Sequence, residues 1–277
     1  MRIAIQGELG SFSHQAALQM EPQATIVPCA VSAEVFKLVE SQQVHAAVIP
    51  IENSLAGSVV EHFDLLLQAD VAIERESLLR IRHNLICIPG TRLEDIRQVL
   101  SHPVALAQCR RFFSQHPAMT PTPFYDTAGS VKHIVSQEND GRRDRGAIAS
   151  EQAALTYGGE VLAAEIEDNP ANYTRFFLIR NSSQVRPLPN PDKVSIAFTV
   201  ENRPGTLVSA LQVFADHKTN LCKVESRPVQ GQPWQYVFYL DYQTSDQEAA
   251  GAALEELRRQ CLWVKELGRY PAAPPLS

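Results

Sequence analysis

A proline-rich segment divides the sequence into two unlike parts. Three prolines fall within the seven residues from Arg186 to Asp192, between two apolar stretches. Proline fixes the backbone φ angle and donates no amide hydrogen, so such a segment favours a stiff, extended linker over a helix or an interior strand. A chain of 277 residues is long enough for two domains. We therefore expect a first domain at 1–182, a linker at 183–192 and a second domain at 193–271.

The part before the linker alternates between short apolar runs and stretches with helical periodicity. The runs typical of strands are 3–6, 25–29, 46–51, 84–89, 97–100, 124–126, 146–150 and 161–166. This alternation is typical of an α/β domain with mostly parallel strands.

The part after the linker is short and has a different order. It reads as strand 194–200, helix 205–217, strand 221–229, strand 235–242, helix 245–260 and strand 262–267. This βαββαβ order predicts a ferredoxin-like domain of regulatory size.

The apolar runs and the cysteines indicate in which cellular compartment the protein resides. No apolar run approaches the roughly 18 residues that span a bilayer, and Met1 to Ile5 begins a strand and not a signal peptide. The five cysteines are odd in number, widely spaced and without a C-x-x-C pair, as expected of reduced thiols. We expect a cytoplasmic protein that does not enter a membrane.

Histidine spacing and charge exclude two further classes. None of the eight histidines lies three or four residues from another, so no helix face offers the two-histidine spacing of zinc hydrolases, and we expect no metal. Residues 1–192 carry 16 basic and 22 acidic side chains, and the net charge of the whole chain is −6. This balance argues against a nucleic acid partner.

A polar pentapeptide, Asn172 to Phe176, leads into an apolar run that ends at Ile179. A hydroxyl, a guanidinium and an aromatic ring at a strand entrance indicate that an anion is held there, because an interior strand usually excludes an unpaired arginine. The alternative interpretation is a surface strand end with an incidental Arg175.

Other polar clusters also follow predicted strands. Gly7 to His14 resembles a phosphate-cradling turn, with Ser11 or Ser13 placed to cap a helix, but it is not G-x-G-x-x-G, and the next strand ends in Cys29 where a ribose-binding acid would stand. Pro50 to Ser58 places a carboxylate, an amide and two hydroxyls at a second turn. Helix N-termini at one edge of a sheet suit a small anion, so we expect a carboxylate-binding crevice and no dinucleotide.

Six motifs in a fixed order resemble those of the prephenate dehydratase family. They are Gly7-x-x-Gly10-Ser11-Phe12-Ser13, Ile49-Pro50-Ile51-Glu52-Asn53-Ser54-x-x-Gly57, Ser101-His102-Pro103, Ala107-Gln108-Cys109, Ala147-Ile148-Ala149-Ser150 and Asn172-x-Thr174-Arg175-Phe176. The second domain resembles an ACT domain, an amino-acid-sensing module, through Arg203 to Leu207 and Glu225 to Pro228. The resemblance implies an α/β catalytic domain of two periplasmic-binding-protein-like lobes, homodimers or homotetramers, prephenate as substrate, feedback inhibition by phenylalanine, and no cofactor.

The resemblance also implies roles for individual residues. The catalytic residues would be Thr174, Glu52, Asn53, Ser101 and Gln108. The substrate-binding residues would be Ser11, Ser13, Ser54, Thr127, Arg175 and Phe176. The residues that bind phenylalanine would be Asn202, Gly205, Thr206, Leu207, Val208, Glu225, Ser226, Arg227 and Pro228.

The reaction removes hydroxide and carbon dioxide from prephenate and gives phenylpyruvate. Thr174 would donate a hydrogen bond to the departing hydroxyl, and Glu52 would supply a proton if its pKa is raised in a closed cleft. Arg175 would help to place the carboxylates, or would instead pair with a carboxylate of the domain such as Glu8 or Asp168.

The sequence departs from the family pattern at three positions. The family has Gln, Ser and Ala where this chain has Val104, Asp126 and Thr206. The first two bear on substrate contacts and the third on the effector. Two other functions remain open: arogenate dehydratase, which performs the same elimination on the aminated substrate, and a non-catalytic small-molecule sensor.

Overall fold

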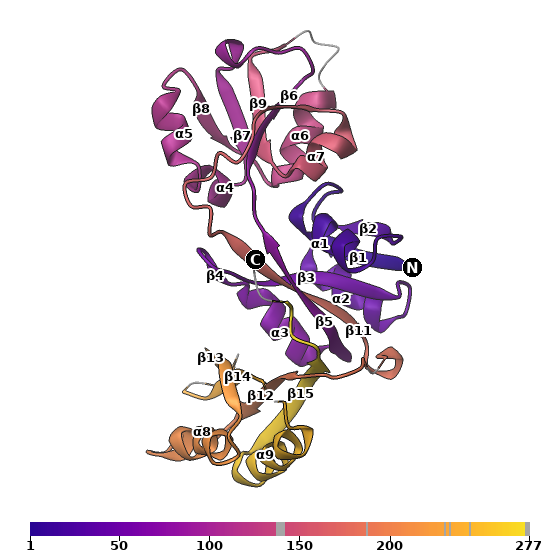
Figure 1. The fold of residues 1–277 in the computed structure, drawn as a ribbon, viewed down its shortest axis with the longest axis vertical. Helices are drawn as coiled ribbons and strands as arrows, with labels where there is room; N and C mark the ends of the chain where they lie inside the picture. Colours follow the sequence, from indigo (N-terminus) through magenta and orange to yellow (C-terminus); the bar gives the residue numbers. More distant parts are fainter. Residues whose placement is uncertain (137–141, 187, 230, 233, 244, 275–277) are drawn as a thin grey trace. The chain divides into compact units, whose positions relative to one another are not determined.

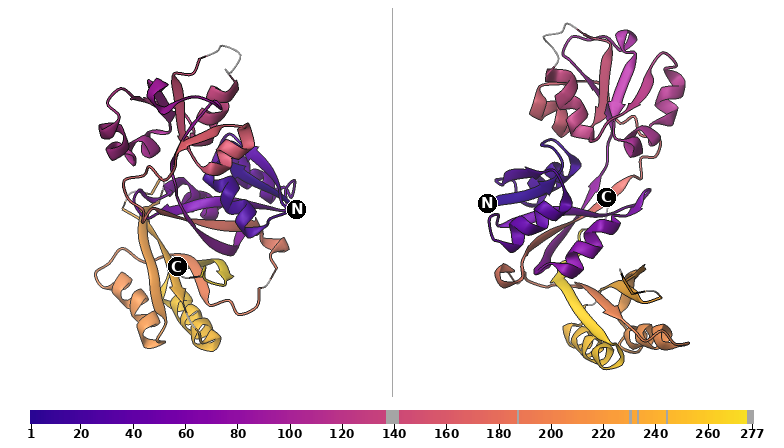
Figure 2. Two further views of the ribbon diagram at one scale, coloured as in Figure 1. Left: turned by 45° about the horizontal axis from the view of Figure 1, so that its top comes forward. Right: turned by 180° about the vertical axis from the view of Figure 1, so that it is seen from behind.

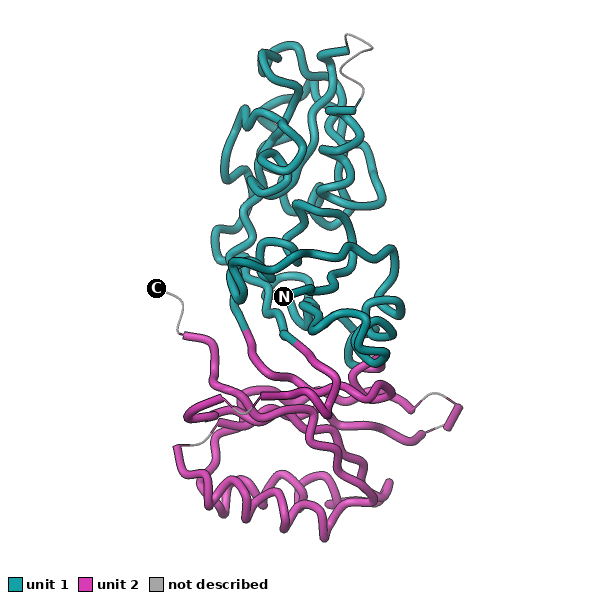
Figure 3. The backbone as a smooth tube through the Cα atoms, turned by 90° about the vertical axis from the view of Figure 1, so that its right-hand side faces the viewer, with its two compact units in different colours: residues 1–63, 77–178 teal, residues 64–76, 179–277 magenta. Residues whose placement is uncertain are grey.

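The computed structural model describes residues 1–136, 142–186, 188–229, 231–232, 234–243 and 245–274 (Figure 1). The chain forms two compact units, one of residues 1–63 and 77–178 and the other of residues 64–76 and 179–277 (Figure 3). The second unit therefore includes a short segment that precedes the linker by more than a hundred residues, whereas the sequence assigns that segment to the first domain.

The first unit has two lobes. The elements of its first lobe are β1 (Arg2–Gln6), α1 (Phe12–Met20), β2 (Thr25–Cys29), α2 (Ser32–Glu40), β3 (Ala46–Asn53) and β4 (Gly57–Ser58). Strand β1 pairs in parallel with β2 and β3, and Ile3 and Ile5 pack against Ala16 and Ala17 of α1. Small alanines on α1 allow the helix backbone to approach the sheet closely.

The second lobe is a sheet covered on both faces. Its strands are β6 (Asn84–Cys87), β7 (Gln98–Ser101), β8 (Thr120–Pro123), β9 (Arg145–Ala149) and β10 (Glu160–Ala163), in the order β10-β6-β9-β7-β8. Its helices are α4 (Pro103–Ala107), α5 (Arg110–Gln115), α6 (Thr127–Ser136) and α7 (Glu151–Tyr157), with a 3-10 turn, η1 (Leu93–Asp95). Leu85 packs with α4 and α5, whereas Ile86 packs with α6 and α7, because alternate side chains of a strand point to opposite faces (Figure 1).

Two details of the sequence prediction are wrong, and a third is only partly right. No strand forms at 124–126, because the strand is β8 at Thr120–Pro123, whose two prolines are tolerated at the edge of the sheet. The sheets are mixed: β1 pairs in parallel with β2 and β3, and β7 with β8 and β9, but β6 pairs antiparallel with β9 and β10. The ten-residue strand β5 (Val71–Arg80) is missing from the prediction.

Two segments connect the lobes of the first unit. The chain leaves the first lobe after β5 and returns before β11 (Tyr173–Asn181), and the Ile81 amide donates to the Asn172 carbonyl at 2.8 Å where these segments meet. The lobes also touch at Gly10, whose carbonyl accepts from Ser150 Oγ at 2.6 Å. A Cβ at Gly10 would lie 2.6 Å from Ala153 Cα, so this contact requires glycine.

The second unit contains the predicted βαββαβ order. Its elements are β12 (Lys193–Thr199), α8 (Thr206–Asp216), β13 (Asn220–Pro228), β14 (Tyr236–Gln243), α9 (Gln247–Gln260) and β15 (Trp263–Tyr270). The strand order β13-β14-β12-β15 continues into the first residues of β5 through Gly268 and Ile73. Helices α8 and α9 cover the same face of this sheet (Figure 2). Helix α3 (Val60–Gln68) and the 3-10 turn η3 (Ser182–Gln184) complete the regular structure of the described residues.

Buried ion pairs explain why β5 escapes the sequence pattern. Glu74 pairs with Arg180 at 2.6 Å, and Glu76 pairs with Lys193 at 3.0 Å, all four residues being buried or nearly so. A run of charged residues usually indicates an exposed segment, but here each carboxylate has a cation within hydrogen-bonding distance. The strand is therefore interior despite its composition.

Candidate active site

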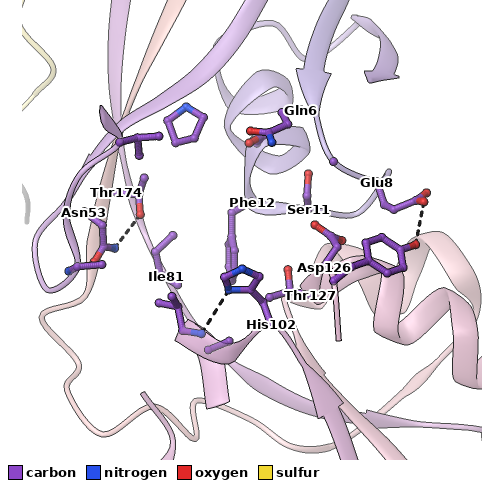
Figure 4. A pocket seen from close by; sticks show the side chains of 18 of the residues that line it. Gln6, Glu8, Ser11, Phe12, Asn53, Ile81, His102, Asp126, Thr127 and Thr174 are labelled. Atoms are coloured by element: carbon purple, nitrogen blue, oxygen red, sulfur yellow. Dashed lines mark hydrogen bonds between the residues drawn. The ribbon is translucent and has the colours of Figure 1, made fainter. Parts of the chain in front are cut away.

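A pocket of about 690 Å³ opens in the first unit and is lined by residues of both lobes (Figure 4). The first lobe contributes the β1–α1 turn, the end of β3 and Thr174 of β11. The second lobe contributes the starts of α4 and α6. A pocket of this size accommodates a small organic molecule.

Four neutral side chains form one hydrogen-bonded chain beside the pocket. We call Asn53, Gln108, Asn172 and Thr174 the amide network. Asn53 Nδ2 donates to Thr174 Oγ1 at 2.9 Å and to Asn172 Oδ1 at 2.8 Å, and Asn172 Nδ2 donates to Gln108 Oε1 at 3.0 Å. The network joins residues from three separated parts of the sequence, and Figure 4 shows the contact between Asn53 and Thr174.

The network fixes which atoms are left to meet a ligand. The amides of Leu55 and Ala56 donate to Asn53 Oδ1 at 3.0 and 2.8 Å, which turns Asn53 Nδ2 toward Thr174. Because Thr174 Oγ1 accepts from Asn53, its own hydroxyl hydrogen is available for donation. Gln108 Oε1 is likewise used within the network, so its NH2 group is available as a second donor.

His83 holds the side chain of Gln108 in place by a hydrogen bond. Its Nε2 lies 2.9 Å from Gln108 Oε1, which can only accept, so Nε2 carries the hydrogen and donates. The side chain is 2% exposed, and burial lowers the pKa of His83, which keeps the imidazole neutral. Its Nδ1 is buried without a hydrogen-bond partner.

The N-terminus of α1 lines one side of the pocket. Ser11 caps this helix by accepting from the His14 amide at 3.3 Å, and no acidic residue lies in the first turn. In the hydrogen bonds of the described residues, the amides of Phe12 and Ser13 have no acceptor. Free amides at a helix N-terminus attract anions, so this turn suits a carboxylate.

Two carboxylates lie on another side of the pocket, and we call Glu8 and Asp126 the acidic wall. Glu8 pairs with Lys132 at 2.9 Å and accepts from the Tyr125 hydroxyl at 3.1 Å (Figure 4). The Lys132 hydrogen bond lowers the pKa of Glu8. Burial, followed by smaller effects that include the charge of Glu8, raises the pKa of Asp126.

Seven of the residues predicted to be catalytic or to bind substrate line this pocket. Among the predicted catalytic residues these are Asn53, Gln108 and Thr174. Among the predicted substrate-binding residues they are Ser11, Ser13, Thr127 and Phe176.

Four others lie outside the lining. Arg175 stacks over the Phe177 ring at 4.6 Å, on the face of β11 opposite to that of Thr174. Ser101 is fully buried and donates to the Ile148 carbonyl at 2.6 Å. Ser54 joins the β3 end to β11 by donating to the Ala171 carbonyl at 3.0 Å. Glu52 is half-buried on β3.

Sequence reasoning missed three polar residues that line the pocket. His83 follows β5 in a crossing segment between the lobes, and no motif marks it. Glu8 lies inside the quoted β1–α1 turn, and Asp126 was noted only as a departure from the family pattern. Charged residues in a turn usually face solvent. Their position in the pocket becomes visible only in the folded structure, where the two lobes lie side by side.

The predicted effector residues fall in two places of the second unit. One is the turn before α8, where Gly205 has φ +87° and Thr206 donates to the Glu201 carbonyl at 2.7 Å. The other is the end of β13, where Arg227 pairs with Asp64 at 2.9 Å. Their role in binding an effector stays a prediction.

The described residues contain neither a membrane-spanning helix nor a metal-binding cluster. No described helix is both long and apolar enough to cross a membrane. In the same residues, no group of three or more His, Cys, Asp or Glu side chains is arranged to hold a metal ion.

The family profile of prephenate dehydratase matches residues 3–184. Arogenate dehydratase 2 of Petunia hybrida is 38% identical over 98% of this chain and 72% of its own length. The crystal structure of prephenate dehydratase from Arthrobacter aurescens in complex with L-Phe is 31% identical, has a TM-score of 0.88, and covers 98% of this chain and 90% of its own. GqqA, described as a novel type of quorum quenching acylase, is 34% identical with a TM-score of 0.89, and covers 99% of both chains.

The two solved structures agree with the α/β fold of this chain. The chain belongs to the prephenate dehydratase family. It is an enzyme of the hydro-lyase class and acts in aromatic amino-acid biosynthesis.

Proposed function

We propose that the protein converts prephenate to phenylpyruvate, or arogenate to phenylalanine, by one decarboxylating dehydration in its pocket. The observation that carries this proposal is the amide network, which leaves the Thr174 hydroxyl and the Gln108 amide as free donors. Both substrates share the same cyclohexadienol ring, and they differ from each other only at the α-carbon of the side chain.

The elimination asks little of the protein beyond placement and hydrogen bonding. The bond to the ring carboxylate breaks and releases carbon dioxide, and its electron pair enters the ring. The bond to the ring hydroxyl breaks in turn, hydroxide leaves and takes up a proton to form water, and the ring becomes aromatic. Negative charge develops on the departing oxygen, so donors aimed at that oxygen lower the barrier.

Thr174 and Gln108 fit the departing hydroxyl, and the free amides of α1 fit a carboxylate. A threonine hydroxyl is a very weak acid, so it stabilises the departing oxygen by donation and does not supply the proton itself. Arg175 has its cation–π contact on the other face of β11, so we do not assign it to the substrate.

Glu52 does not line the pocket, although Pro50 and Asn53 of the same strand do. The predicted role of proton source depended on a place inside the cleft. We therefore do not include Glu52 in the proposed mechanism.

An acylase reaction finds less support in the pocket. Acyl transfer needs a nucleophile activated by a neighbouring base. In the described structure, no serine or threonine hydroxyl and no thiol of the lining residues is hydrogen-bonded to a histidine ring or a carboxylate, and Thr174 Oγ1 is bonded to an amide.

The proposal is tested by incubating the purified protein with prephenate and, separately, with arogenate, while the aromatic product and carbon dioxide are followed. We expect equal amounts of both products from at least one substrate, without added metal or cofactor. Binding of either substrate without product would instead indicate a sensor, and hydrolysis of an amide with no elimination would indicate an acylase.

We further propose that phenylalanine inhibits the enzyme through an ACT domain formed by the second unit, in a homodimer or homotetramer. The βαββαβ order and the predicted effector segments at 202–208 and 225–228 support this assignment. The relative from Arthrobacter aurescens is described in complex with L-Phe. Activity should fall cooperatively as phenylalanine is added, and no response up to millimolar concentration would contradict the regulatory role.

A further inference from the structure

We propose that Asp126 selects the substrate by binding the ammonium group of arogenate, so that arogenate is preferred over prephenate. This inference rests on the proposed dehydratase function. The two substrates differ at one α-carbon, which carries an ammonium group in arogenate and a ketone in prephenate. A single charged residue at that position of the pocket is enough to discriminate between them.

The two oxygens of Asp126 have different surroundings. Oδ1 accepts from the Gly129 amide at 2.7 Å and so caps helix α6. Oδ2 faces Gly7, where the position that a Cβ would occupy lies 3.1 Å away. Because residue 7 is glycine, with φ +92°, no side chain covers this oxygen from that direction. The carboxylate lines the pocket, close to Ser11 and Thr127 in Figure 4.

The charge of Asp126 is not balanced by a neighbouring cation. In the described structure, Asp126 forms no ion pair within 4 Å, and Lys132, the cation nearest to this wall, is paired with Glu8. The other ionisable groups that act on the two carboxylates are Tyr125, Tyr157 and His102. Buried carboxylates elsewhere in the chain have partners, as Glu74 has Arg180. A partly buried carboxylate without a cation is costly unless a ligand supplies the positive charge.

The unpaired charge of Asp126 distinguishes the two substrates because they carry different groups on the α-carbon. An ammonium group donates up to three hydrogen bonds and carries the charge that Asp126 lacks. A ketone only accepts, so its oxygen would face a carboxylate oxygen with no hydrogen between them. The free amides of α1, on the neighbouring side of the pocket, fit the carboxylate attached to the same α-carbon.

Helix capping does not explain the carboxylate. Serine and asparagine cap helices about as well as aspartate does, and capping uses only Oδ1 here. Replacement of Asp126 by either residue therefore removes the charge and keeps the cap, so both variants should fold.

The experiment measures kcat/KM for arogenate and for prephenate with the wild type, Asp126→Ser and Asp126→Asn. We expect the wild type to prefer arogenate. Loss of one charge-assisted hydrogen bond should lower kcat/KM for arogenate by about 10- to 100-fold in both variants. The value for prephenate should stay unchanged or rise. Glu8→Gln is the matched comparison, since Glu8 is already neutralised by Lys132, and it should change the ratio between substrates much less.

Each outcome decides the inference. An unchanged ratio in both variants, or an equal loss for the two substrates, would overturn it, the latter because it would indicate a role for Asp126 in the shared elimination. Turnover of both substrates by the wild type with no effect of Asp126 would leave the dehydratase function intact. Turnover of neither substrate would overturn the function itself, and the inference with it.

Discussion

The pocket has two sides that solve different problems. The amide network, Asn53, Gln108, Asn172 and Thr174, is neutral, and its internal hydrogen bonds leave selected donors free. The acidic wall, Glu8 and Asp126, is charged, and only Glu8 has a cation partner. In our account, the neutral donors stabilise the departing hydroxide, which both substrates release. The unpaired carboxylate of Asp126 instead recognises the α-carbon substituent, which differs between the two substrates.

The largest effect is expected from Thr174, on the neutral side. Thr174→Ala removes the donor to the departing hydroxyl and should lower kcat by at least about 100-fold with either substrate. Thr174→Ser keeps the hydroxyl and should retain most of the activity. Circular dichroism and thermal melting of both variants serve as the control for folding. Nearly normal turnover by Thr174→Ala would show that the network does not act on the leaving group.

An intermediate effect is expected from His83, a positioning residue of the same side. His83→Leu removes the hydrogen bond to Gln108 Oε1 and frees the amide to turn, which should lower kcat by about fivefold. KM should change little, because the donor matters most in the transition state. His83→Gln offers a replacement donor and should restore part of the loss. An effect on KM alone would mean that Gln108 only binds the substrate.

The smallest effect is expected on the pH dependence of the protein's stability, through the two carboxylates of the acidic wall. Because the folded-state pKa of Asp126 is raised, the folded protein binds a proton at this site more tightly than the unfolded chain does. The ionised carboxylate therefore costs stability above its folded pKa, and this cost disappears as pH falls below the unfolded pKa of about 4.

Asp126→Asn should accordingly have a slightly higher Tm than the wild type near pH 7.5, and the difference should shrink toward pH 4. The same pH series with Glu8→Gln provides the contrast: the pKa of Glu8 is lowered, so this variant should lose stability near neutral pH. A lower Tm for Asp126→Asn at neutral pH would mean that the charge of Asp126 is well compensated in the free protein.

Much of the fold follows from local sequence patterns. The apolar runs at β1, β2 and β3 and the βαββαβ order after the linker are visible because they bury continuous apolar side chains. Strand β5 is not visible, because its charged residues are interior only through partners about a hundred residues away. Long-range pairing of this kind leaves no local signal.

The sequence motifs predicted which segments form the site, but not which side chains of each strand point into the pocket. Asn53 and Thr174 line the pocket, while their sequence neighbours Glu52 and Arg175 do not. A shift of one residue along a strand moves a side chain to the opposite face, and the sequence does not say which face meets the pocket. The place of Asp126 in the pocket was not predictable, because the Gly7 turn that its Oδ2 faces belongs to the other lobe and lies more than a hundred residues earlier in the sequence.

One set of rate measurements tests this division most directly: kcat/KM for arogenate and prephenate with the wild type, Thr174→Ala and Asp126→Ser. The account predicts that Thr174→Ala lowers both values by similar factors, whereas Asp126→Ser lowers only the value for arogenate. It would be contradicted if Thr174→Ala spared either substrate, or if Asp126→Ser lowered both values equally.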